Sequence, residues 1–139
     1  MSFLARAYLF AGRCCEHIAC CVRILQFRLS GLELRLLEVG SGTRFYVPAR
    51  SGGRGALRIG NNNSFGWRLA PRMGNGEIVL QPRSEDAEIV VGNGNAFSNN
   101  ISIVAMGKIT IGDGCLIGDQ VAILDCDFHE MDPRKRRSG

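Results

Sequence analysis

The sequence is poor in proline and histidine and has no long uninterrupted apolar run. Of its 139 residues, 4 are proline and 2 are histidine, while 45% are hydrophobic and 22% charged. Glycine does not recur at every third position, which excludes a collagen-like chain. No apolar run approaches the ~20 residues that a membrane-spanning helix needs, because charges interrupt the N-terminal segment at Arg6, Arg13, Glu16 and Arg23. These absences leave a globular chain of one domain.

The N-terminal segment, residues 1–30, is apolar but is repeatedly broken by charge. A secretory signal would need an unbroken apolar centre, and Arg6 and Arg13 interrupt it. The segment therefore predicts an amphipathic helix. Its apolar face can cover one end of a core or lie on a membrane surface, and the sequence leaves both roles open.

Four of the 6 cysteines lie in this segment as Cys14, Cys15, Cys20 and Cys21. Neighbouring cysteines rarely pair with each other, and the C-C-x4-C-C spacing is not a usual zinc spacing. We therefore expect free thiols in a reducing cytoplasm, with any buried cysteine acting as a small apolar residue.

A six-residue repeat organises the rest of the chain. Three segments align on an aliphatic residue followed by glycine and then an apolar residue six positions on: LRIGNNNSFGWRL from Leu57, IVVGNGNAFSNNI from Ile89, and ITIGDGCLIGDQV from Ile109. Val91 and Ile111 are twenty residues apart, which is three sixes plus two extra residues. The pattern predicts coils of three short strands stacked in parallel, with glycine, asparagine or aspartate at corners where φ is positive.

The repeat is less regular at two places. Residues 31–56 are interpreted as an entry coil rich in loops, and the offset of thirty-two between Ile59 and Val91 predicts a loop thrown out of one coil, with a strand around Ile78–Leu80. A sandwich of ordinary short strands with Gly-Asn turns is the alternative. Three glycine-anchored matches at the same spacing favour the coils.

The segment ITIGDGCLIGDQVAILDCDFHEMDPRKR resembles the hexapeptide-repeat acyltransferases, particularly the sugar O-acetyltransferases that act on maltose, galactosides, nodulation factors and exopolysaccharides. The resemblance covers residues 89–137 well, residues 57–70 less well, and the first thirty not at all. It implies an all-β chain: a left-handed parallel β-helix over residues 31–139, preceded by the helix of residues 1–30. It further implies a homotrimer, acetyl-CoA as donor, a sugar hydroxyl as acceptor, and work in surface polysaccharide synthesis in the cytoplasm or at the inner face of the membrane.

The most specific part of the resemblance is DCDFHEMDP, which looks like the family's loop that carries the catalytic histidine. A neutral imidazole suits the removal of a proton from an attacking hydroxyl, so we assign His129 as general base. Asp127 is assigned to orient the imidazole, a role for which Asp125 and Glu130 are alternatives, or it is a turn residue.

Substrate-binding residues are assigned from the same resemblance. Ser98, Asn99 and Asn100 correspond to a region that faces the acceptor, and amide groups suit sugar hydroxyls because they both donate and accept hydrogen bonds. Asp125 is placed with them, while the asparagines can equally be corner residues. Trp67 can stack on a sugar ring or serve as a core or subunit contact.

Other functional classes fit the sequence less well. Zinc carbonic anhydrases with the same fold need three histidine ligands, and this chain has only His17 and His129, so no metal is expected. The run Arg134–Arg137 lacks aromatic interleaving, so no nucleic acid is expected. Family members carry further coils after the histidine loop, whereas this sequence ends at Gly139. A truncated β-helix fragment that only oligomerises or binds, and is weakly active or inactive alone, is therefore the alternative.

Overall fold

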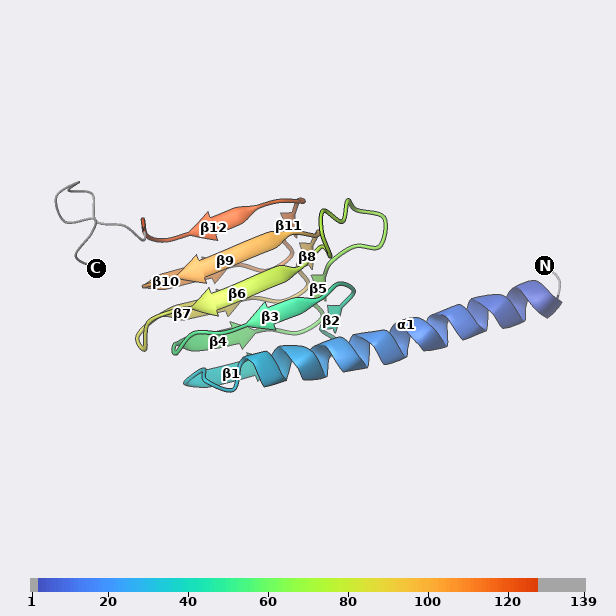
Figure 1. Cartoon of the computed structure of the whole chain (residues 1–139), viewed down its shortest axis with the longest axis horizontal. Helices are drawn as coiled ribbons and strands as arrows, with labels where there is room; N and C mark the ends of the chain where they lie inside the picture. The colour runs from blue at the N-terminus through green and yellow to red at the C-terminus, as the bar shows by residue number, and fades with distance from the viewer. Residues whose placement is uncertain (1–2, 128–139) are drawn as a thin grey trace.

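The computed structural model describes residues 3–127, and within the N-terminal helix it describes the side chains of Gly12 and of Cys14 onward. One helix, α1 (Phe3–Ser30), precedes twelve short strands. The strands form three sheets of four parallel strands each (Figure 1). The first sheet holds β1 (Leu36–Val39), β4 (Ala56–Ile59), β7 (Glu88–Val91) and β10 (Lys108–Ile111); the second holds β2 (Arg44–Phe45), β5 (Ser64–Phe65), β8 (Ala96–Phe97) and β11 (Leu116–Ile117); the third holds β3 (Ala49–Ser51), β6 (Ile78–Pro82), β9 (Ile101–Ala105) and β12 (Ala122–Leu124).

Successive strands along the chain belong to the three sheets in turn, so every third strand lies beside its counterpart. We call each set of three a coil, giving four coils from β1–β3 to β10–β12. The arrangement is consistent with the parallel β-helix that the repeats predict. The N-terminal helix predicted over residues 1–30 is also present, as α1.

The register of the sheets confirms the alignment of the repeats. Ile59 pairs with Val91, and Val91 pairs with Ile111. Phe65 pairs with Phe97 in the second sheet. The offset of thirty-two is taken up by the segment between β5 and β6, where residues 66–77 form the predicted loop.

The first coil is more regular than the sequence analysis expected. Val39 pairs with Ile59 and Phe45 pairs with Phe65, both at an offset of twenty. Residues 36–51 therefore form the coil predicted within residues 31–56, with three strands paired in register where more loop was expected. The signal was present in the sequence, since Val39-Gly40 with Phe45 six residues later repeats the motif.

Glycine and asparagine serve two different purposes at the corners. Positive φ is found at Gly42, Asn62, Gly94 and Gly114, which are equivalent positions in the four coils. The glycine directly after the aliphatic residue has another reason: a Cβ on Gly60 would lie 2.6 Å from the carbonyl oxygen of Gly92 in the next coil. Stacked coils thus approach too closely at this position for any side chain.

Aromatic rings run through the core as a column. Phe27 of α1, Phe45, Phe65 and Phe97 follow one another with ring centroids 4.6, 4.9 and 4.4 Å apart. All four are buried, and aliphatic residues such as Leu57, Ile78 and Ile89 pack around them. Because Phe27 is the first ring of the column, α1 covers the end of the stack at which the chain enters its coils.

Candidate functional site

The last described strand leads directly to the predicted histidine loop. β12 ends at Leu124, and Asp125, Cys126 and Asp127 follow it. His129 and Glu130 lie outside the described residues, as does the basic run Arg134–Arg137. The structure therefore describes the chain up to two residues before His129 and does not describe His129 itself.

Asp125 connects the end of β12 to the coil below. Its Oδ1 accepts a hydrogen bond from the backbone N–H of Met106 at 2.7 Å, and its Oδ2 accepts one from Gly107 at 2.8 Å. Met106 and Gly107 form the corner that follows β9 in the coil below. The Asp125 carboxylate thus links the end of the fourth coil to the third coil. Both of its oxygens are used in this corner contact.

The next two residues, Cys126 and Asp127, differ from Asp125 in their burial and in their hydrogen bonds. The Asp127 side chain is exposed, and no described residue donates a hydrogen bond to its carboxylate. Cys126 is half-buried; burial, with Asp125 and Asp127 adding to it against the opposing charge of Arg83, raises the pKa of its thiol. Because a protonated thiol is a poor nucleophile, Cys126 is not suited to accept an acyl group at neutral pH.

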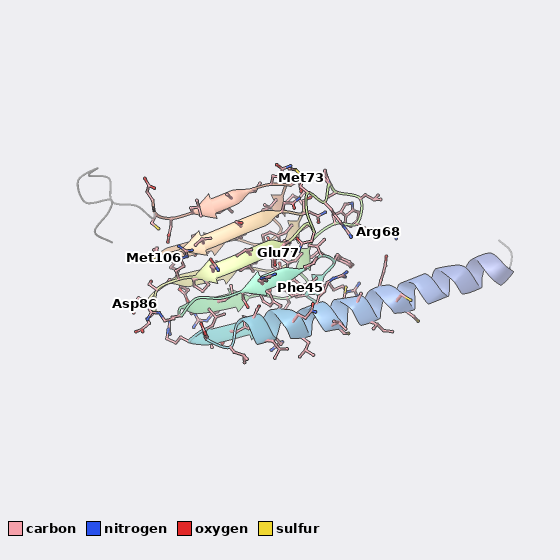
Figure 2. The ribbon with its side chains drawn as sticks, viewed as in Figure 1. Phe45, Arg68, Met73, Glu77, Asp86 and Met106 are labelled. Atoms are coloured by element: carbon pink, nitrogen blue, oxygen red, sulfur yellow. The ribbon has the colours of Figure 1, made fainter. Side chains whose placement is uncertain are left out.

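Three of the four predicted substrate-binding residues lie at the other end of the third sheet, away from the fourth, Asp125. Ser98, Asn99 and Asn100 precede β9, whereas Asp125 follows β12, which runs parallel to β9. Six residues of strand separate Asn100 from Met106, which is roughly 20 Å. Figure 2 shows the same separation, with Arg68 and Met73 near one end of the sheets and Met106 and Asp86 near the other. Within one chain the two predicted groups are not brought together.

Asn99 is buried, and its amide holds the loop of residues 66–77. Its Oδ1 accepts a hydrogen bond from the N–H of Trp67 at 2.9 Å. Its Nδ2 lies 3.1 Å from the carbonyl oxygens of Trp67, Ala70 and Pro71. Asn100, with φ of 57°, donates to the Pro71 carbonyl and to Asp119. Both asparagines thus act at a corner, while their contact with an acceptor stays a prediction.

Trp67 lies at the start of this loop and is 58% exposed. The interpretation of Trp67 as a core residue is therefore wrong for the single chain. Leu69 and Met73 of the same loop are also exposed. The loop presents apolar side chains outward, because its inner side is occupied by the amide of Asn99.

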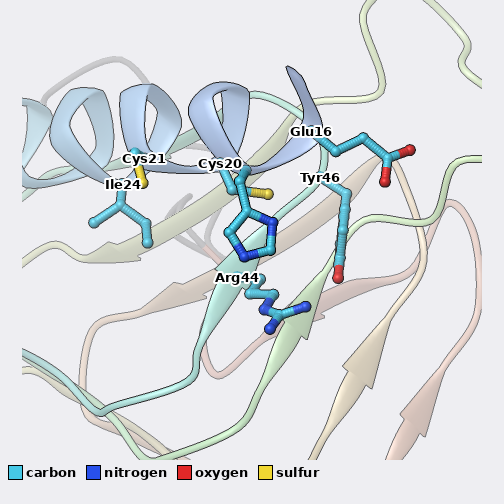
Figure 3. Close-up of a pocket in the computed structure, with 7 residues that line it drawn as sticks. Glu16, Cys20, Cys21, Ile24, Arg44 and Tyr46 are labelled. Atoms are coloured by element: carbon cyan, nitrogen blue, oxygen red, sulfur yellow. The ribbon is translucent and has the colours of Figure 1, made fainter. Parts of the chain in front are cut away.

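A groove that sequence reasoning missed lies between α1 and the first two coils. One cavity of about 470 Å³ is shown in Figure 3, where Cys20, Ile24 and Glu16 of α1 lie above Arg44 and Tyr46. A second cavity of about 270 Å³ adjoins the same helix, and three arginines line it: Arg23, Arg68 and Arg72. No sequence motif marks this groove, because its residues come from the helix, the first coil and the loop.

The charge of the groove is mostly positive. Arg68 pairs with Glu16 at 3.1 Å, but among the described residues no carboxylate pairs with Arg23 or Arg72. A side-chain hydrogen bond with Tyr46 is the main reason that the pKa of Arg44 is raised. Cys20 is buried, and this burial raises the pKa of its thiol despite Arg23 and Arg44. The groove can attract an anion, but it presents no activated thiol.

Three further features of the described residues limit the possible chemistry. All six cysteines are unpaired, and the buried Cys20 packs as an apolar residue. No group of three histidine, cysteine, aspartate or glutamate side chains within the described residues could hold a metal ion. Within the described residues, α1 does not combine the length and the apolar character that a membrane-crossing helix needs.

Comparison of the chain with family models, with curated proteins and with solved structures found no match in any of the three.

Proposed function

We propose that this chain transfers an acetyl group from acetyl-CoA to a sugar hydroxyl, with His129 as general base. The proposal includes the finer architecture that the resemblance implies: a left-handed β-helix that assembles as a homotrimer. It also places the chain in the cytoplasm, or at the inner face of the membrane, in the synthesis of surface polysaccharide.

One observation carries the proposal. β12 ends at Leu124, and Asp125, the first residue of DCDFHEMDP, is anchored to the corner at Met106 and Gly107. A fixed residue four positions before His129 limits where a base at that position can lie. The geometry therefore supports a role for Asp125 in placing the loop, in preference to direct contact with a substrate.

The reaction needs one proton transfer and one bond exchange. The acceptor hydroxyl oxygen attacks the thioester carbonyl carbon as its proton passes to the imidazole of His129. The carbon–sulfur bond then breaks, and the departing CoA thiolate takes up the proton. The alternative through an acyl-cysteine is disfavoured, since the raised pKa of Cys126 keeps its thiol protonated.

Asp127 is the better candidate to orient the imidazole. Its carboxylate accepts no hydrogen bond from any residue that the structure describes, whereas both oxygens of Asp125 are occupied. A carboxylate bonded to the imidazole would fix its tautomer and stabilise the imidazolium.

The separation of the two predicted groups within one chain favours a site between subunits. Asn100 and Asp125 lie at opposite ends of the third sheet, roughly 20 Å apart. In the proposed homotrimer, the histidine loop of one copy faces acceptor-binding residues of its neighbour. Ser98, which is half-buried, and Asn100 are then the residues available to an acceptor, because Asn99 is fully buried.

The two histidines of the chain provide the experiment. His129→Ala is expected to lower acetyl transfer about 10²- to 10⁴-fold, the usual contribution of a general base. His17→Ala is the matched control. His17 belongs to α1 and lines the groove, so its substitution is expected to leave the rate unchanged. Release of the CoA thiol in the presence of sugar measures the rate. An unchanged rate in the His129 variant would place the base elsewhere.

A second candidate is a binding module without catalysis, and the arginines of the groove favour it. Arg23, Arg68 and Arg72 surround one cavity with only Glu16 to oppose them. Titration with inorganic pyrophosphate tests this candidate, with Arg72→Ala expected to weaken binding and Arg50→Ala as control. Binding that is equal in both variants would reject it.

A further inference from the structure

The outer face of α1 carries an exposed apolar stripe. We name the outer stripe as Ile18, Val22, Leu25, Leu29 and Leu32, the last lying in the turn after the helix. These side chains are between 49% and 78% exposed. Cys20 and Phe27, which are buried against the first coil, lie on the opposite face of the helix. The described helix therefore has two apolar faces, and the coils cover only one of them.

The spacing of the outer stripe is that of a helix–helix seam. Its members are separated by four, three, four and three residues, which is the heptad pattern of coiled coils. In the sequence the same spacing continues toward the N-terminus through Cys15, Ala11, Tyr8 and Leu4. A heptad repeat keeps one narrow line of side chains facing a partner helix over many turns.

The positions of the charged residues on α1 distinguish between a second helix and a lipid surface as the partner of the outer stripe. Glu16 and Arg23 line the groove on the coil side, and Glu16 is paired there with Arg68. Among the described helix residues that flank the stripe, Ala19, Cys21 and Gln26 are uncharged, and Arg28 in the last turn is the one cation. Two such stripes can therefore meet over residues 18–26 without repulsion between like charges. A helix on an anionic lipid surface would instead carry lysine or arginine along its flanks.

The area and the shape of the molecule also suit a second helix. Five aliphatic side chains that are half to three-quarters exposed present roughly 300 Å² of apolar surface, a substantial part of the ~800 Å² that each partner contributes to a stable interface. The helix of 28 residues is about 42 Å long, so further contacts are available along it. Figure 1 shows its N-terminal half extending beyond the sheets, which leaves room for another chain.

We propose that the outer stripe is a self-association surface, on which α1 of a second copy of this chain packs in a coiled coil. This inference does not depend on the proposed acetyl transfer. It adds to the proposed homotrimer a contact that is separate from the sheets, so it links copies through their N-terminal helices.

Sedimentation equilibrium of the full chain tests the proposal. The double variant Val22→Glu, Leu25→Glu is expected to raise the dissociation constant about tenfold or more, and to lower the average mass relative to the unsubstituted chain. Leu69→Glu is the control, because Leu69 is also an exposed aliphatic residue but lies on the loop of residues 66–77. Equal masses for the double variant and the unsubstituted chain would overturn the proposal, provided that circular dichroism shows both folded.

A measurement without substitution guards against a variant that fails to fold. Cys14, Cys15 and Cys21 are exposed beside the outer stripe. A bismaleimide added to the native chain is expected to join two copies through these cysteines, as peptide mapping would show. Links confined to Cys115 or Cys126 would contradict the proposal.

Flotation with vesicles of phosphatidylcholine and phosphatidylglycerol tests whether the outer stripe binds lipid instead of a second copy. A chain that stays monomeric in solution, floats with the vesicles, and loses flotation in the double variant would identify lipid as the occupant. That result would overturn the proposal of a second copy.

Discussion

The two ends of the stack of coils differ in what covers their apolar side chains. Where the chain enters, Phe27 of α1 lies on Phe45 and is fully buried. Where the described chain leaves, Ile117 and Ile123 are only partly buried, and Leu116 is 85% exposed. The difference shows that apolar side chains at an end of the stack are fully buried only where another element packs over them. We therefore expect the covered end to contribute more to stability than the end at which β12 lies.

The largest effect is expected from removing the cover. Phe27→Ala should destabilise the chain by about 3–5 kcal/mol, because it removes a fully buried ring and leaves a cavity above Phe45. Ile117→Ala at the other end should cost about 1–2 kcal/mol, since that side chain is only partly buried. Urea denaturation measures both. Equal losses would show that the two ends are covered to the same degree.

The glycine after each aliphatic residue tests the same comparison at the backbone. Gly60→Ala should destabilise by about 1–3 kcal/mol, because its Cβ would meet the carbonyl of Gly92. At the equivalent position of the last described coil, a Cβ on Gly112 would meet nothing within 4 Å. Gly112→Ala should therefore be nearly neutral by thermal denaturation. A cost similar to that at Gly60 would reveal a further layer packed on the fourth coil.

Asp125 provides a test at the end of the stack where β12 lies. Asp125→Ala removes the acceptors for Met106 and Gly107 and should destabilise by about 1–2 kcal/mol. Acetyl transfer should fall more steeply than stability, because the histidine loop loses its anchor. Denaturation and turnover measured on the same samples separate the two effects. Turnover that is unchanged despite lost stability would show that the loop does not depend on this anchor.

The smallest effect concerns a row of alternating charges on the first sheet. Lys108 of the fourth coil donates to Glu88 at 2.8 Å, and Arg58 also pairs with Glu88. The hydrogen bond from Lys108 is the main reason that the pKa of Glu88 is lowered. A lowered carboxyl pKa stabilises the fold above the usual glutamate range, and this contribution disappears as pH falls through the folded-state pKa.

The corresponding variant is Glu88→Gln. It should be slightly less stable than the unsubstituted chain at neutral pH, and the difference should vanish in acid. Thermal denaturation from neutral to acid pH measures it, with Glu38→Gln as control because Arg58, at 3.2 Å, is the one cation that pairs with Glu38 among the described residues. A difference that persists in acid would mean that packing, and not charge, accounts for the change.

The sequence predicted the repeats well because the coils repeat a local rule. Ile59, Val91 and Ile111 are equivalent positions of stacked coils. Aligning the repeats of the sequence on these residues therefore predicts which strands pair. The positive φ of Asn62 and Gly94 followed from residue type. The regularity of the first coil was underestimated, because only Val39-Gly40 and Phe45 keep the motif there.

Long-range features could not be predicted in the same way. The groove joins Arg23 of α1 to Arg68 and Arg72 of the loop, and no local pattern relates these residues. The role of Asn99 as the amide that holds the loop depends on where residues 67–71 fold back, which the repeat does not specify. The role of His129 stays a prediction from the resemblance, since it lies outside the described residues.

Mass spectrometry of a sugar incubated with the chain and acetyl-CoA tests the central claim most directly. The account predicts that a sugar acquires an acetyl ester on a hydroxyl while an equal amount of CoA thiol is released, and that His129→Ala suppresses both. Intact acetyl-CoA with no acetylated sugar, from a folded chain offered a broad panel of acceptors, would contradict the claim.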